Sequence, residues 1–119
     1  MIRKGVGMSR RQRGRESEKC VADYLVRHGF ETAHVTSMAA SGSDVLGIDG
    51  IDFEVKARSG FPVSETLAQL KRRRSETGLG VAVMRMNGQG EKSVGDWVAV
   101  LTFDDLIYLL KASGYGKTR

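Results

Sequence analysis

The chain is poor in the residues that build disulfide-rich, zinc-binding or membrane-spanning proteins. It has one cysteine, Cys20, and two histidines, His28 and His34, so an internal disulfide is impossible and no zinc-ligand spacing is present. No apolar run approaches the ~20 residues that cross a bilayer, and no hydrophobic stretch follows the basic N-terminus. We therefore expect a cytoplasmic protein with no signal peptide and no contact with a membrane.

The charges that are present are unbalanced. Lys and Arg number 19 against 14 Asp and Glu, which gives a net charge of +5. A basic protein of this kind suits a polyanionic partner, either nucleic acid or an anionic membrane surface, and the charge alone does not choose between them. With 119 residues the chain has room for one domain, expected over residues 16–112. We expect residues 1–15, rich in Arg and Gly, to be a flexible basic arm and residues 113–119 to be a disordered tail.

Hydrophobic periodicity predicts a mixed α/β domain built on one sheet. We expect helices over residues 16–28, 65–77 and from Thr102 or Asp104 onward, and strands over residues 32–37, 45–46, 51–56, 79–86 and 97–101. Ser64 is expected to cap the second helix, and Gly29 and Gly78 to end the first two. The Gly-rich residues 87–95 are expected to form a mobile hairpin tip.

The strand at residues 51–56 alternates apolar and charged side chains. Successive side chains of a strand point to opposite faces, so one face is charged and carries Asp52, Glu54 and Lys56. The simplest interpretation is a strand with one face in water. A second carboxylate on the same face would favour a catalytic or metal-binding site.

The turn before this strand decides whether Asp44 is that second carboxylate. A three-residue loop over 48–50, with its glycine in the left-handed position of a bulge, would pair Gly47 with Ile51 and set Asp44 across from Glu54. Two carboxylates facing each other at roughly 5 Å repel, so they would need a bound cation or a raised pKa. The alternative is a two-residue turn, which would send the two carboxylates to opposite faces.

A third carboxylate comes from the first helix. Glu18 shares a stripe with Val21, Ala22 and Leu25 and should point toward the sheet. An inward carboxylate costs several kcal/mol, whereas the helix dipole returns only about 0.3–1 kcal/mol. We expect a metal ion or a basic partner to supply the rest, and the alternative is an exposed acid in the first turn.

Together these residues resemble the PD-(D/E)xK nuclease superfamily, through Asp44 followed ten residues later by Glu54-Val55-Lys56. Within it the chain is most similar to archaeal-type Holliday junction resolvases. That likeness rests on a Gly-Arg-rich start, a glutamate eleven residues before Gly29-Phe30, and an Ala-Ser-Gly-Ser stretch before the aspartate. Ser43 stands where the superfamily has proline, and residues 69–86 would also suit a VRR-NUC-like nuclease.

The resemblance implies a restriction-endonuclease-like αβββαβ core with a mixed central sheet, followed by a further strand and a C-terminal helix. It implies a structure-selective DNA endonuclease that cleaves Holliday junctions or other branched DNA, and therefore a homodimer with two sites. The implied catalytic residues are Glu18, Asp44, Glu54 and Lys56. The implied ligands of Mg²⁺ or Mn²⁺ are Asp44, Glu54, the carbonyl of Val55, and Glu18 for a second ion or a metal-bound water. Lys56 would orient the attacking water or touch the phosphate.

Contacts to DNA are expected from basic and polar side chains along the chain. These are Arg11, Arg13, Arg15, Ser41, Arg58, Gln69, Arg72 and Arg73. Two other functions fit the composition: a non-catalytic basic module that binds nucleic acid, and a nuclease-like fold that has lost catalysis and serves in assembly.

Overall fold

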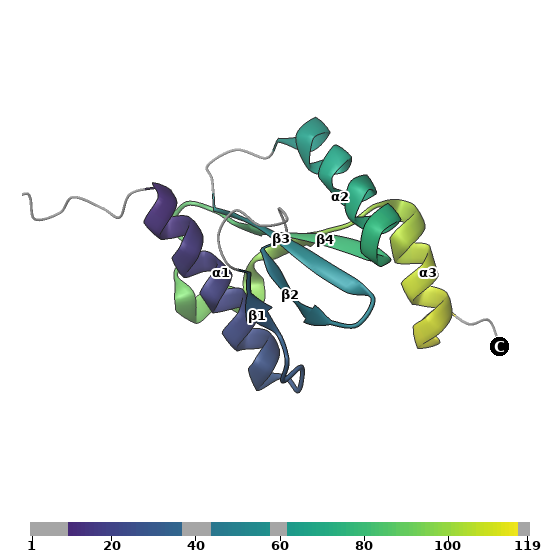
Figure 1. The fold of residues 1–119 in the computed structure, drawn as a ribbon, viewed down its shortest axis with the longest axis horizontal. Helices are drawn as coiled ribbons and strands as arrows, with labels where there is room; N and C mark the ends of the chain where they lie inside the picture. The colour runs from purple at the N-terminus through teal and green to yellow at the C-terminus, as the bar shows by residue number, and fades with distance from the viewer. Residues whose placement is uncertain (1–9, 37–43, 58–61, 117–119) are drawn as a thin grey trace, which may run out of the picture.

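The computed structural model describes residues 10–36, 44–57 and 62–116, which form an α/β domain with one five-stranded sheet (Figure 1). Its elements are α1 (Arg10–Arg27), β1 (His34–Val35), β2 (Val45–Ile48), β3 (Ile51–Ala57), α2 (Val63–Thr77), β4 (Leu79–Arg85), the 3₁₀ helix η1 (Glu91–Asp96), β5 (Val98–Val100) and α3 (Phe103–Ser113). The strands follow one another in the order β1-β2-β3-β4-β5. Among the strands of the described ranges, β3 and β4 are the one parallel pair, so the predicted mixed sheet is confirmed.

Helices α1 and α2 pack on opposite faces of the sheet. Val21 and Ala22 of α1 belong to a buried cluster against which Phe53 of β3 packs. Leu70 of α2 belongs to a second cluster with Ala82 of β4. Since Ala82 pairs with Glu54, the residue after Phe53, alternation along β3 turns Glu54 toward α2. The charged face predicted for β3 is therefore covered by a helix.

The β2–β3 hairpin reaches the expected register by a different turn. Ile48 pairs with Ile51, so the turn has two residues and the predicted three-residue loop is wrong. The register then shifts by one residue before Val45, which pairs with Phe53. The shift is made near Gly47, whose φ of 101° favours glycine. Because this bulge cancels the effect of the shorter turn, Val45 has the predicted partner, and Asp44 lies next to β3 as predicted.

Three boundaries differ from the expectation. Helix α1 begins at Arg10, so residues 10–15 of the predicted flexible arm are helical. Helix α2 begins at Val63, with Thr66 N donating to the Pro62 carbonyl oxygen at 2.9 Å, so Ser64 lies inside the first turn instead of capping it. Residues 87–95, predicted to be a hairpin tip, contain most of η1.

Other boundaries agree with the expectation. Thr102 caps α3, since its side chain accepts a hydrogen bond from Asp105 N at 3.1 Å. Gly114, which was not predicted as a helix end, terminates α3 in the left-handed conformation. In the described ranges, none of the helices is long and apolar enough to cross a membrane.

Candidate active site

Asp44 lies where β1, β2 and β3 meet. Its backbone N donates to the Phe53 carbonyl oxygen at 3.1 Å, and its carbonyl oxygen accepts from Thr36 N at 3.2 Å. Its carboxylate Oδ2 accepts from Val55 N at 2.5 Å. Three hydrogen bonds thus fix the half-buried Asp44 beside the strand that carries Glu54 and Lys56.

Glu18 of α1 meets Asp44, and their carboxyl groups share a hydrogen bond. Burial, the charge of Asp44 and that hydrogen bond raise the pKa of Glu18 to about 7, while the Arg15 guanidinium opposes the rise. Below pH about 7 Glu18 therefore holds a proton that it can donate to Asp44. The prediction that Glu18 points toward the sheet is confirmed.

The pKa of Asp44 is also raised, chiefly by burial. The hydrogen bond from Val55 N and the one from Glu18 act against the rise, the charge of Glu54 adds to it, and Lys56 lowers the pKa again. The other three predicted catalytic side chains, Glu18, Glu54 and Lys56, thus lie in contact with Asp44 or within electrostatic range of it. A pair of carboxyls with raised pKa values is a site where a cation can replace a proton.

Glu54 has a partner that was not foreseen. It is 4% exposed, and its Oε2 lies 2.9 Å from Nε of Arg73, which is 2% exposed. The expectation that Arg73 contacts DNA is wrong in this arrangement, because its guanidinium is buried between α2 and β3. Among the described residues, no three His, Cys, Asp or Glu side chains gather closely enough to hold a metal ion.

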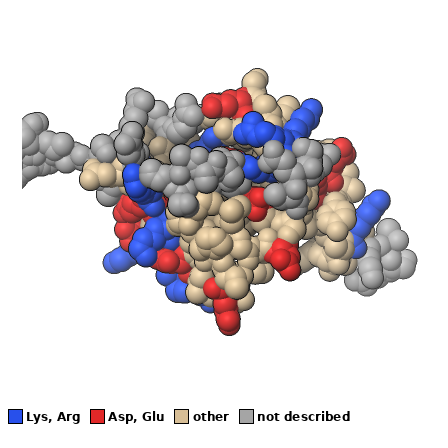
Figure 2. Space-filling model, in the orientation of Figure 1, with Lys and Arg blue, Asp and Glu red and all other residues tan. Residues whose placement is uncertain are grey.

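The other predicted DNA contacts are scattered. Arg15 and Arg72 are exposed, and Figure 2 shows basic side chains over α2 at the top and mixed charges over α1 at the left. Arg13 is half-buried and donates to the Met86 carbonyl oxygen at 3.4 Å. Gln69 is half-buried, and its buried Oε1 has no hydrogen-bond partner among the residues that the structure describes. Outside the described residues lie Ser41, Arg58 and the side chain of Arg11.

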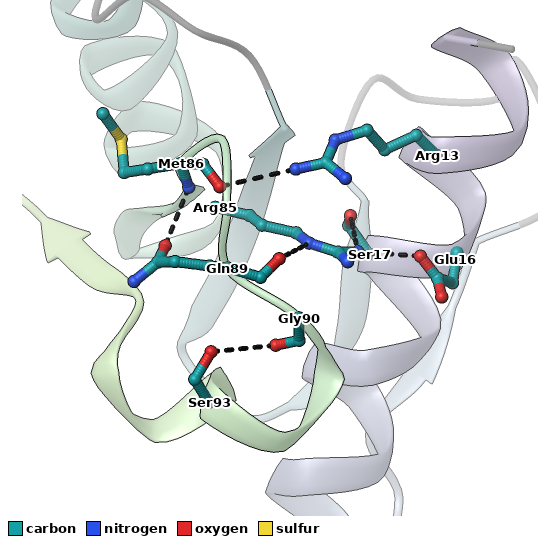
Figure 3. A network of polar contacts seen from close by, with 8 residues as sticks. All are labelled: Arg13, Glu16, Ser17, Arg85, Met86, Gln89, Gly90 and Ser93. Carbon is teal, nitrogen blue, oxygen red and sulfur yellow. Dashed lines mark hydrogen bonds and ion pairs between the residues drawn. The ribbon is translucent and has the colours of Figure 1, made fainter. Parts of the chain in front are cut away.

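A network around Arg85 anchors α1 to the sheet, and the sequence did not single it out (Figure 3). Arg85 Nη1 lies 2.8 Å from Glu16 Oε1 and 3.0 Å from Ser17 Oγ, and Nε donates to the Gln89 carbonyl oxygen at 2.9 Å. The guanidinium also lies 5.0 Å from the centre of the Trp97 ring. Because Glu18 follows Glu16 and Ser17 directly, this buried network positions Glu18 over Asp44. The signal in the sequence is an arginine that closes an apolar strand and so needs buried partners.

The raised pKa of Glu18 makes a pH-dependent prediction for stability. Glu18 loses its proton at pH about 7 in the folded chain and at pH about 4.5 in the unfolded chain. Between these two pH values the folded state binds more protons, so the contribution of Glu18 to the free energy of unfolding falls as pH rises. Glu18→Gln is expected to reduce that fall. The measurement is the urea midpoint between pH 4.5 and pH 8 in EDTA, with Glu31→Gln, an exposed glutamate beyond α1, as the control. Identical pH profiles for Glu18→Gln and wild type would contradict the prediction.

No family model matches the chain, and neither a curated protein nor a solved structure matches it.

Proposed function

We propose that the chain is a metal-dependent, structure-selective DNA endonuclease that hydrolyses phosphodiesters, with branched DNA such as the Holliday junction as its substrate. The observation that carries the proposal is the contact between the carboxyl groups of Glu18 and Asp44, beside Glu54 and Lys56. Folding has brought together two acidic groups, one from α1 and one from the residue before β2, at an energetic cost that raises both pKa values. Function is the simplest reason for keeping such an arrangement.

The fold is compatible with this proposal. The first six principal elements come in the order αβββαβ, and the sheet is mixed. We propose that they form a restriction-endonuclease-like core, with β5 and α3 added at its C-terminal end.

The donor set suits Mg²⁺ or Mn²⁺, since both ions prefer hard oxygen ligands. Asp44, Glu54 and the carbonyl oxygen of Val55 would hold the ion, with Glu18 for a second ion or a bound water. When bound, the ion supplies a nucleophile by lowering the pKa of a water and offsets charge that develops on the phosphate. Asp44 is held ready by Val55 N, whereas Glu18 has to release its proton first.

The remaining residues would act on the substrate. Lys56 follows Glu54 on the same strand face and would orient the attacking water or contact the phosphate. Gln69 has a buried acceptor, Oε1, that a water could satisfy. The exposed guanidinium groups of Arg15 and Arg72 would bind the backbone of DNA, with an affinity that falls steeply with salt and without reading sequence.

The buried pair of Glu54 and Arg73 favours a second candidate, a non-catalytic basic module that binds nucleic acid. In that case Glu54 serves only to neutralise Arg73, and the basic side chains of α1 and α2 do the binding. The two functions differ in whether any DNA is cut.

The test incubates the purified chain with labelled four-way junction, flap, linear duplex and single-stranded DNA, in Mg²⁺ or in EDTA. We expect cleavage of the junction in Mg²⁺ alone, at symmetric positions on opposing strands. Cleavage of the flap or duplex with the junction intact would keep the nuclease and remove the junction as its substrate. Binding without cleavage of any DNA would establish the second candidate.

A further inference from the structure

Helix α3 carries an apolar surface that the fold leaves uncovered. Its exposed apolar side chains, together with one just beyond its end, are 37% to 78% accessible: Phe103, Leu106, Ile107, Tyr108, Leu110 and Tyr115. Within the described residues, no side chain of α3 belongs to either hydrophobic cluster. Figure 1 shows α3 at the right-hand end of the molecule, far from α1.

Four of these residues form one continuous stripe. Phe103, Leu106, Ile107 and Leu110 repeat at the i, i+3, i+4, i+7 spacing that places side chains on one helix face. The helix meets the body of the protein through the opposite side, where Asp105 is 5% exposed. The stripe therefore points outward. Monomers rarely expose contiguous apolar patches larger than a few hundred Å², and larger ones mark sites of association.

The two ends of α3 are complementary in shape. A surface hollow of about 370 Å³ is lined by Ile107, Leu110, Lys111, Tyr115 and Gly116. At the other end Phe103 projects with 75% of its surface exposed. If a two-fold axis passes near Ile107, residue 103 of one copy lies opposite residue 111 of the other. Phe103 of each copy would then fill the hollow of the other copy.

The two ends are also complementary in charge. Asp104 and Lys111 are seven residues apart, so they lie on the same flank of the stripe. In an antiparallel helix pair the same flanks face each other, which places Asp104 beside the partner's Lys111, twice by symmetry. The opposed helix dipoles favour the same orientation.

From these features we propose that α3 is a dimer interface, where a second copy of this chain packs with its own α3 antiparallel. A stable interface buries roughly 800 Å² per partner. The stripe supplies on the order of several hundred Å² of this, since a large aromatic side chain buries ~150–250 Å². Beyond the stripe, the edge strand β5 ends at Val100, three residues before α3, and its Val98 is 52% exposed. The proposal rests on α3 alone and holds whether or not the chain is a nuclease.

The test is a charge reversal read out by sedimentation equilibrium of the full chain. The wild type is expected to be a dimer at micromolar concentration. Asp104→Lys and Lys111→Asp should each weaken dimerisation by about tenfold or more, because each creates two like-charge contacts. An equimolar mixture of the two variants should recover the dimer as a heterodimer, since both contacts are again between opposite charges. Circular dichroism of each variant checks that α3 still forms.

A hydrophobic variant gives a second readout. Ile107→Lys places a charge near the two-fold axis and should give a monomer, whereas Val26→Lys, at an exposed apolar position of α1, should leave the dimer unchanged. The proposal is overturned by a wild type that stays monomeric up to about 100 μM. It is equally overturned by an Ile107→Lys variant that remains dimeric, or by a variant mixture that stays monomeric.

Discussion

Asp44→Asn is expected to abolish Mg²⁺-dependent cleavage while the protein stays folded. The amide keeps an oxygen that can accept the hydrogen bond from Val55 N, and its NH₂ can donate to Glu18. The variant loses the negative charge of the Asp44 carboxylate, which is proposed to bind the metal ion. Metal-ion catalysis supplies several kcal/mol, so the rate should fall by about 10³-fold or more. The measurement is the single-turnover rate on a four-way junction at saturating Mg²⁺.

The matched control is Asp49→Asn, which removes the same charge from the exposed β2–β3 turn. It should cleave at the wild-type rate. Without metal, Asp44→Asn should unfold at the same or a higher urea concentration than wild type above pH 7, because a repulsive pair has been removed. Wild-type cleavage by Asp44→Asn would show that the paired carboxyls are not the catalytic centre.

Substitution of Asp44 tests the proposed catalysis more directly than substitution of Glu54, because the two carboxylates differ in their surroundings. Glu54 is held in a buried ion pair, so its removal leaves Arg73 charged and without this partner in the interior. A Glu54→Ala protein that failed to cut DNA would not separate lost chemistry from lost folding. Within the described ranges, no lysine or arginine forms an ion pair with the half-buried Asp44, although the charge of Lys56 acts on it.

The strands and the position of Asp44 could be predicted because they depend on local alternation and on turn residues. The turn itself could not, since a two-residue turn with a bulge near Gly47 and a three-residue turn lead to the same register at Val45. The sequence offers two glycines, Gly47 before the turn and Gly50 in it, and it does not say which of them takes up the extra residue.

The role of Arg73 could not be predicted for a different reason. Four consecutive basic residues, 71–74, spread around α2, so one of them has to face the sheet. Thr66, Leu70 and Arg73 share the inward face, as the buried positions show. The sequence did not indicate the partner of Arg73. The simplest interpretation of β3 left its charged face in water, so a buried Glu54 beneath α2 was not expected.

Removing Arg73 is expected to be the most destabilising of the substitutions considered. Arg73→Met keeps most of the side-chain volume but leaves Glu54 buried without this counter-charge, a change that costs about 3–5 kcal/mol. Small domains are stable by only about 5–15 kcal/mol, so the variant should be near unfolding. Urea titration in EDTA measures the loss, and Arg72→Met, at an exposed position of the same helix, should lie within about 1 kcal/mol of wild type.

Two further measurements separate a structural role of Glu54 from a metal-binding one. Combining Arg73→Met with Glu54→Leu removes both charges and should recover most of the lost stability, because an apolar pair can replace a buried ion pair. If Glu54 also binds the proposed metal ion, Mn²⁺ should raise the melting temperature of Arg73→Met more than that of wild type, since the cation substitutes for the missing guanidinium. Equal shifts would limit Glu54 to its pairing with Arg73 and leave Glu18 and Asp44 as the carboxylates available to a metal. If Arg73→Met lowered the free energy of unfolding by less than about 1 kcal/mol, the ion pair between Glu54 and Arg73 would be accessible to water.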